Sequence, residues 1–180
     1  MLPLPYPTSR LVLRRFERAD AAPMLPLIGD FEVANGVLRI PHPYTTEDAD
    51  AFLSMLEREP EKPIAAVTLD GAVIGAVGLE LDGVHGRGEL GYWIGRPYWG
   101  RGYATEAARA MIAIGFTRLS LNKITAHHYT RNPASGRVLE KVGMVREGLL
   151  KQHFQRWGRY EDSVAYGLTR DVWEVRCAGT

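Results

Sequence analysis

The sequence predicts a mixed α/β domain built on a largely antiparallel sheet, and three observations lead to this fold class. The chain has 180 residues, a length that suits one domain spanning the whole sequence. Apolar residues make up 46% of it, which is ordinary for a globular protein and argues against disorder. The apolar period changes several times, and a three-strand meander in the middle excludes a purely alternating βαβ fold.

The elements of the first half follow from their apolar spacing. In chain order we expect a strand, two helices and a three-strand meander, over residues 9–16, 21–28, 46–59, 64–69, 72–81 and 89–94. Asp20 is placed to cap the first helix, and Pro60 ends the second. The dipeptide Asp70-Gly71 predicts a two-residue hairpin turn inside the meander.

The second half alternates helices and strands before it closes with two strands. These elements are expected over residues 104–115, 123–128, 132–142, 144–150 and 163–168. Asn132 is placed as the N-cap of the second of these helices, with Pro133 at its first helical position. Gly143 stands just past its end, where glycine commonly terminates a helix.

Charge and cysteine content exclude several classes of function. There are 22 Lys and Arg residues against 21 Asp and Glu, whereas non-specific nucleic-acid binding needs a basic surface. The single cysteine, Cys177, excludes an intrachain disulfide framework and a cysteine zinc site. No apolar run is long enough to cross a bilayer, and no secretory signal is visible at the start. We therefore expect a cytoplasmic protein that binds neither nucleic acid nor membrane.

The segment from residue 90 to residue 107 predicts an anion-binding site. A strand runs into a turn that contains Gly100 and Gly102, and the turn opens a helix whose first amides have no intrahelical partner. The helix dipole favours negative charge there, and Arg101 adds a cation. A phosphate or pyrophosphate is the natural guest, although a glycine-containing helix start without a ligand fits the same residues. Neither a P-loop nor the dinucleotide fingerprint is present.

Several spaced motifs resemble the GNAT N-acetyltransferases, and in particular their RimJ/RimL-like branch. The motifs are Gly91-Tyr-Trp-Ile94, Tyr98-Trp-Gly-Arg-Gly-Tyr-Ala-Thr-Glu-Ala107, Asn132-Pro-Ala-Ser135, Leu139-Glu-Lys-Val-Gly-Met-Val-Arg-Glu-Gly148 and Gly158-Arg-Tyr-Glu-Asp-Ser163. The likeness runs from the first strand to about Trp173. Trp99 departs from the Gln or Arg of many GNAT proteins but is typical of this branch. The resemblance implies a V-shaped splay between the strands 89–94 and 123–128, with about four helices flanking the sheet.

The resemblance implies acetyl-CoA as the co-substrate and no metal ion. Pantetheine would lie in the splay and pair with the strand backbone, the loop amides would hold the pyrophosphate, and a strand amide would stabilise the oxyanion. The implied cofactor-binding residues are Tyr92, Trp93, Ile94, Trp99, Gly100, Arg101, Gly102, Tyr103, Ala104, Thr105, Asn132, Ser135 and Arg137. For Asn132, helix capping alone is an equally good explanation. No pair among the five histidines has convincing metal-ligand spacing.

The resemblance assigns the general acid to Ser135 and leaves the general base open. Many other GNAT proteins use a tyrosine one turn later, but that position is Leu139 here, which has no proton to donate. A base must take a proton from the attacking amine, and the candidates are Glu89, His153 and Asp162. Asp162 fits a turn brace equally well, and His153 fits a half-buried strand position.

Strand periodicity bears on which side chains can meet in the site. Glu89 shares a face with Trp93 and opposes Ile94, so without a bulge we expect it to face the wrong way for a base. His127 and His128 are neighbours on one strand and are expected on opposite faces.

The function that the resemblance implies is transfer of an acetyl group to a primary amine by direct attack in a ternary complex. The acceptor is either a protein N-terminus or a small amine such as a polyamine or an antibiotic. A non-catalytic acyl-CoA-binding module, which would keep the Gly100–Ala104 loop, stays open as the alternative. A homodimer formed through an edge of the C-terminal strands is a further expectation from the family.

Overall fold

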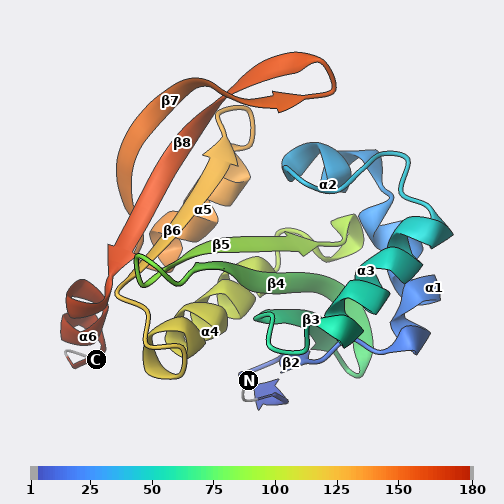
Figure 1. Ribbon diagram of the computed structural model, residues 1–180, viewed down its shortest axis with the longest axis horizontal. Helices are drawn as coiled ribbons and strands as arrows, with labels where there is room; N and C mark the ends of the chain where they lie inside the picture. Colours follow the sequence, from blue (N-terminus) through green and yellow to red (C-terminus); the bar gives the residue numbers. More distant parts are fainter. Residues whose placement is uncertain (1–3, 179–180) are drawn as a thin grey trace.

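The computed structural model describes residues 4–178, and within them it forms one eight-stranded sheet (Figure 1). The spatial order is β1-β2-β3-β4-β5-β6-β8-β7, and every pair of neighbours is antiparallel except β5 and β6. The strands are β1 (Tyr6–Pro7), β2 (Val12–Arg14), β3 (Ile64–Leu69), β4 (Ala72–Asp82), β5 (Arg87–Ile94), β6 (Lys123–Tyr129), β7 (Val145–Arg156) and β8 (Arg159–Thr169). The predicted fold class, a mixed α/β domain with a largely antiparallel sheet, is confirmed.

Six α-helices occur in the described residues, two more than the number expected. They are α1 (Ala21–Ile28), α2 (Phe31–Gly36), α3 (Thr46–Arg58), α4 (Tyr103–Thr117), α5 (Pro133–Lys141) and α6 (Arg170–Ala178). The unexpected helices are α2 and α6. At six residues, α2 is too short to show a helical apolar period, although its N-cap Asp30 accepts a hydrogen bond from the Glu32 amide.

The helices α4 and α1 pack against opposite faces of the sheet. Leu90 and Ile94 of β5 belong to the larger core, together with Phe116 of α4. Trp93, on the same strand, instead packs with the smaller cluster around Met24 of α1. This alternation is the period-two pattern of a strand buried on both faces. As a result, β5 is fixed in register and in direction between two apolar layers.

β5 and β6 diverge soon after they begin to pair. Their parallel ladder runs from Arg87 opposite Lys123 to Glu89 opposite Thr125 and then ends. β6 continues to Tyr129 by pairing with β8, while β5 continues by pairing with β4. Figure 1 shows the strands β6, β8 and β7 rising away from β4 and β5 to form a wedge. The predicted V-shaped splay is therefore present.

Two expectations for the first half need correction. Of the predicted strand 9–16, only Val12–Arg14 is a strand, β2, which pairs with β3 on one side and with the short strand β1, before the predicted range, on the other. The side chain of Asp20 does not cap α1, because Arg14 binds both of its carboxylate oxygens at 2.7 and 2.8 Å. The backbone amide of Glu17 also donates to this carboxylate, at 2.8 Å, so both oxygens are engaged before α1 begins. The Asp70-Gly71 turn is confirmed, with φ of 50° and 84° at the two residues.

The closing hairpin is longer than the sequence predicts. β7 and β8 extend past residues 144–150 and 163–168 and meet at Trp157 and Gly158, where φ is 47° and 75°. Their outer halves are mostly exposed, so the sequence lacks the apolar alternation that marks a half-buried strand. In Figure 1 the tip of this hairpin reaches toward α2. No helix within residues 4–178 has the length and apolar character needed to span a membrane.

Candidate active site

The edge of β5 that faces β6 carries unpaired backbone groups. The Gly95 amide donates to the Ile74 carbonyl of β4 at 2.8 Å, and β5 pairs with β4 without a bulge. Because backbone groups alternate between the two edges of a strand, Trp93 turns its own groups toward β4, while Tyr92 and Ile94 turn theirs toward the splay. The indole of Trp99 donates to the Ile94 carbonyl at 2.6 Å. Of the three residues predicted to pair with pantetheine, Trp93 is therefore already committed to the sheet.

The loop that follows β5 has the shape of an anion site. Gly100 and Gly102 have φ of 75° and 82°, a region that glycine enters freely and other residues rarely adopt. No side chain caps α4, so the amides of Tyr103, Ala104 and Thr105 keep their hydrogen-bonding capacity for a ligand. The space where a Cβ of Gly100 would stand is open to 4 Å. These residues fit a pyrophosphate.

Arg10 braces this loop through contacts that no sequence motif predicts. Its guanidinium donates to the Arg101 carbonyl at 2.9 Å and to the Glu106 carboxylate at 2.8 Å. The other oxygen of Glu106 accepts from Thr8 at 2.6 Å and from Ser9 at 2.9 Å. The first turn of α4 is thereby tied to the segment between β1 and β2. These contacts join residues more than ninety positions apart, and no local pattern announces such a pair.

Glu106 should make the free energy of unfolding depend on pH in the acid range. Burial alone would raise the pKa of Glu106, but hydrogen bonds from Thr8 and Arg10 outweigh it and lower the pKa from 4.5 to about 2. A carboxyl with a depressed folded pKa stabilises the fold above its unfolded pKa, and this contribution is lost as pH falls from about 4.5 toward 2. We expect Glu106→Gln to lower the melting temperature at neutral pH by an amount that shrinks over that interval. Melting curves of both proteins at stepped pH would contradict this if the gap stayed constant.

Ser135 and Tyr92 form a pair of hydroxyl groups at the mouth of the splay. Their oxygens lie 2.8 Å apart, one from the first turn of α5 and the other from β5. Burial raises the pKa of Tyr92 to about 12, against the opposing effect of its hydrogen bond with Ser135, so the phenol keeps its proton. When Tyr92 donates to Ser135, the proton of the serine is free for a leaving group. The Tyr92 hydroxyl was missed by the sequence reasoning, which assigned only its backbone a role.

Both polar groups of the Asn132 side chain form hydrogen bonds within the protein. Its carbonyl oxygen accepts from the Ser135 amide at 3.3 Å, which confirms the predicted N-cap. Its amide donates to the Gly36 carbonyl at the end of α2, also at 3.3 Å. A contact with the cofactor stays a prediction for Asn132, as it does for Arg137 on the exposed face of α5.

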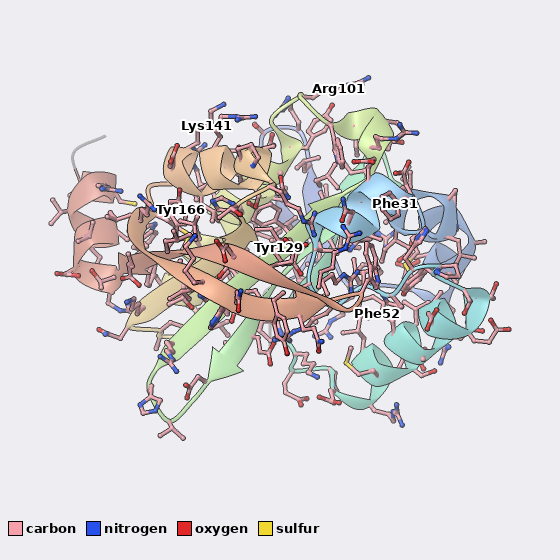
Figure 2. The ribbon with its side chains drawn as sticks, turned by 90° about the horizontal axis from the view of Figure 1, so that it is seen from above. Phe31, Phe52, Arg101, Tyr129, Lys141 and Tyr166 are labelled. Atoms are coloured by element: carbon pink, nitrogen blue, oxygen red, sulfur yellow. The ribbon has the colours of Figure 1, made fainter. Side chains whose placement is uncertain are left out.

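A cleft of about 870 Å³ opens beside the splay and reaches the Ser135–Tyr92 pair. Its walls come from the α2–α3 connection, α3, the strands β4, β5 and β6, and the start of α5. Among its lining residues are Tyr44, Phe52, Trp93, Tyr129 and Phe154, which give it an aromatic wall. In the view from above, Arg101 lies at one edge of the molecule, Phe52 lies toward the opposite side, and Tyr129 lies between them (Figure 2). Loop and cleft thus approach the splay from different sides.

Glu89 lies in this cleft, contrary to the expectation that its face points away from the site. The predicted alternation holds, since Glu89 and Trp93 share a face and no bulge interrupts the pairing with β4. The difference arises because the cleft runs along that face and through the splay to Ser135. A carboxylate oxygen of Glu89 lies 3.5 Å from Nδ1 of His127, and the pKa of Glu89 is held below its usual value by this histidine, against burial.

The other two candidate bases lie outside the cleft lining. Asp162 accepts from the Lys151 ammonium at 2.7 Å and from the Gln152 amide at 2.8 Å, and these contacts hold its pKa below the usual value. Asp162 therefore braces the bulge in β7, where the register shifts between Leu150 and Phe154. His153 stands in the same bulge, with its ring 5.8 Å from that of His127. A catalytic role for either residue stays a prediction.

Arg156 fastens the tip of the β7–β8 hairpin to α2 and to the α2–α3 connection, which lines the cleft. Its guanidinium donates to the Leu38 carbonyl at 2.9 Å, to the Ala34 carbonyl at 3.0 Å and also to the Ile40 carbonyl. These carbonyls belong to α2 and to the connection that follows it. Trp157 stacks on Phe31 of α2, and Arg156 lies over the Trp157 ring. The hairpin tip and the α2–α3 connection, which both have little apolar periodicity in their sequences, are thus joined to each other beside the cleft. Between residues 4 and 178, no cluster of three or more histidine, cysteine or acidic side chains is arranged to bind a metal ion.

Comparison with known proteins agrees with this architecture. A family model described as an acetyltransferase (GNAT) domain matches residues 10–145. The chain is 32% identical over 168 residues to an uncharacterized N-acetyltransferase of Bacillus licheniformis, p20, and the match covers 91% of this chain and 94% of that relative.

Solved structures of acetyltransferases share the fold, and two of them serve as examples. The crystal structure of a GNAT-family acetyltransferase from Bacillus anthracis has a TM-score of 0.83 at 26% identity, over 92% of this chain and 98% of that one. The crystal structure of spermidine N-acetyltransferase from Vibrio cholerae, in complex with CoA and spermine, has a TM-score of 0.80 at 25% identity, over 92% and 99%. The chain therefore belongs to the GNAT family of acetyltransferases, whose co-substrate is acetyl-CoA.

Proposed function

We propose that this protein is an N-acetyltransferase of the RimJ/RimL-like branch, which transfers an acetyl group from acetyl-CoA to a primary amine by direct attack. The proposal rests on one observation, that three structural features of the site lie next to one another. The unpaired edge of β5, the Ser135–Tyr92 pair and the cleft all meet where β5 and β6 separate. The motifs from Gly91 to Ala107 and from Asn132 to Ser135 support the branch.

The co-substrate would bind along β5 and end at the loop. Pantetheine would pair with the free backbone groups of Tyr92 and with the free amide of Ile94, whose carbonyl accepts from Trp99, in the manner of an added strand. The amides from Gly100 to Thr105 would hold the pyrophosphate at the start of α4. This arrangement directs the thioester toward Ser135 and the cleft.

The chain's own groups can then support each stage of the transfer. The amine attacks the thioester carbon, and an amide on the free edge of β5 stabilises the negative oxygen that forms. The nitrogen loses a proton to a general base, the carbon–sulfur bond breaks, and the sulfur takes a proton from Ser135, whose oxygen is held by Tyr92.

The cleft suits an acceptor that carries positive charge. Among its described lining residues, five carboxylates face two permanent cations: Asp48, Glu59, Glu61, Glu80 and Glu89, against Arg39 and Lys62. Such an excess of carboxylates attracts an ammonium group by simple Coulomb attraction. The aromatic wall adds surface that binds cations and apolar chains. We therefore favour as acceptor a small amine with an apolar or polycationic skeleton, with the N-terminus of a basic protein as the second candidate.

A screen of acceptors tests the proposal. The purified protein is incubated with acetyl-CoA and a panel of polyamines, arylalkylamines, aminoglycosides and N-terminal peptides, and the free thiol is measured. We expect amine-dependent release of thiol with at least one class of cationic amine. Acetyl-CoA binding, seen as a rise in melting temperature, without turnover on any amine would refute the proposal and leave a non-catalytic acyl-CoA-binding module.

A further inference from the structure

His127 lies on β6 just beyond the last residue that pairs with β5. Its side chain lines the same cleft as Glu89 and Ser135. Its Nδ1 atom is buried and stands 3.5 Å from a Glu89 carboxylate oxygen, an ion-pair distance, and among the described residues it makes no hydrogen bond. Because buried polar atoms are almost always paired, this nitrogen requires an explanation.

Two neighbouring rings of β7 fix the orientation of the imidazole. His153 stacks on His127 with the ring centroids 5.8 Å apart and the planes 29° apart. Phe154 meets the ring edge-on, also at 5.8 Å, with the planes at 90°. With one nitrogen directed to Glu89, Nε2 is the nitrogen left to accept a proton.

The carboxylate of Glu89 is the charged group that faces the His127 imidazole directly. Glu89 faces it from β5, and the pKa of this carboxyl is lowered by His127, so the carboxylate is ionised at neutral pH. His153 faces it from β7, and Arg39 lies farther off, where its guanidinium pairs with Glu80. The nearest charge is thus the carboxylate of Glu89, which faces Nδ1 at 3.5 Å and orients the ring.

We propose that His127 is the general base that removes the proton of the acceptor nitrogen, and that Glu89 is the positioning residue that holds and stabilises its imidazolium. This proposal rests on the function proposed above. The nitrogen forms its bond to the thioester carbon, the carbon–sulfur bond breaks with its electron pair on sulfur, and the nitrogen loses a proton to Nε2. The sulfur takes a proton from Ser135. Solvent then removes the proton from His127 and restores that of Ser135, so protons and charge balance.

The test uses His127→Asn with the acceptor found in the screen. Asparagine keeps an amide that can face Glu89 but has no titrating nitrogen. We expect kcat to fall by about 100-fold or more, the usual contribution of a general base, with an unchanged acetyl-CoA-induced rise in melting temperature. The acid limb of the kcat/KM profile should disappear, and added imidazole should restore part of the rate. His85→Asn, in the exposed turn between β4 and β5, is the matched control and should behave as wild type.

Glu89→Gln gives a second readout that a structural role would not produce. Because glutamine keeps the size of the side chain but loses the charge that faces Nδ1, we expect kcat to fall while KM and the acetyl-CoA-induced melting shift stay close to those of the wild type. A wild-type rate and pH profile in His127→Asn would overturn the inference. If His127→Asn fails to fold, a wild-type kcat in Glu89→Gln would overturn it. Absence of turnover by the wild-type protein would instead contradict the proposed function itself.

Discussion

Gly102→Glu is expected to abolish the rise in melting temperature that acetyl-CoA produces in the wild-type protein. Gly102 has φ of 82° and directly precedes α4, so a side chain there is strained and stands at the anion site. A glutamate adds negative charge where the free amides and the helix dipole would otherwise bind a pyrophosphate. Binding that requires these amides should be lost. Thermal melts across a series of acetyl-CoA concentrations measure the effect.

Gly71→Glu is the control that separates backbone strain from loss of the anion site. Gly71 has φ of 84° in the hairpin between β3 and β4, and the space around it is open to 4 Å, as at Gly100. The same substitution there imposes the same strain and charge far from the loop. We expect a lower melting temperature without ligand and a full shift with acetyl-CoA. If Gly102→Glu keeps the full shift as well, the assignment of the loop as the pyrophosphate site is wrong.

Ser135→Ala is expected to reduce kcat by about 100-fold or more while the affinity for acetyl-CoA stays close to that of the wild type. The serine oxygen lies 2.8 Å from the buried phenol oxygen of Tyr92, which can hold it while its proton is transferred, and a general acid contributes on this scale. A loss confined to kcat indicates an interaction made only in the transition state. Steady-state rates with the acceptor varied, together with the acetyl-CoA melting shift, separate the two quantities.

Tyr92→Phe completes this experiment because it removes one hydroxyl and keeps the ring. If the two hydroxyls act as a unit, the double variant should be no slower than the slower of the two single variants, which is a non-additive result. Tyr160→Phe, on the exposed part of β8, is the control for loss of a phenol and should be silent. Turnover by Ser135→Ala equal to that of wild type would remove Ser135 as the acid.

Local signals predicted those parts of the site whose geometry is set within a few residues. The glycines at positions 100 and 102 marked the loop, since only glycine readily takes its left-handed backbone. Asn132, Pro133 and Gly143 marked the ends of α5 through capping preferences, and all three stand where expected. The resemblance to the GNAT proteins supplied the splay, which no local pattern encodes.

The remaining parts depend on contacts between segments that are distant in the sequence. The Tyr92–Ser135 pair joins β5 to α5 across 43 positions, and nothing near either residue indicates the other. Strand periodicity assigns Glu89 to one face of β5. Whether that face lines a cleft depends on how far β6 diverges from β5, which no local pattern determines. The contact between the hairpin tip and the α2–α3 connection depends on the Arg156 guanidinium, which donates to backbone carbonyls. The sequence of that connection has almost no apolar periodicity.

The most direct test of the account is a mass measurement of both the protein and the acceptor in one reaction. The protein is incubated with acetyl-CoA alone and then with a cationic amine from the screen. Direct attack predicts an unchanged protein mass at both stages and an acceptor heavier by one acetyl group only when protein, acetyl-CoA and amine are all present. An acetylated protein that passes its acetyl group to the amine would contradict direct attack. If no amine in the screen gains the mass of an acetyl group, the proposed acetyltransferase activity itself is contradicted.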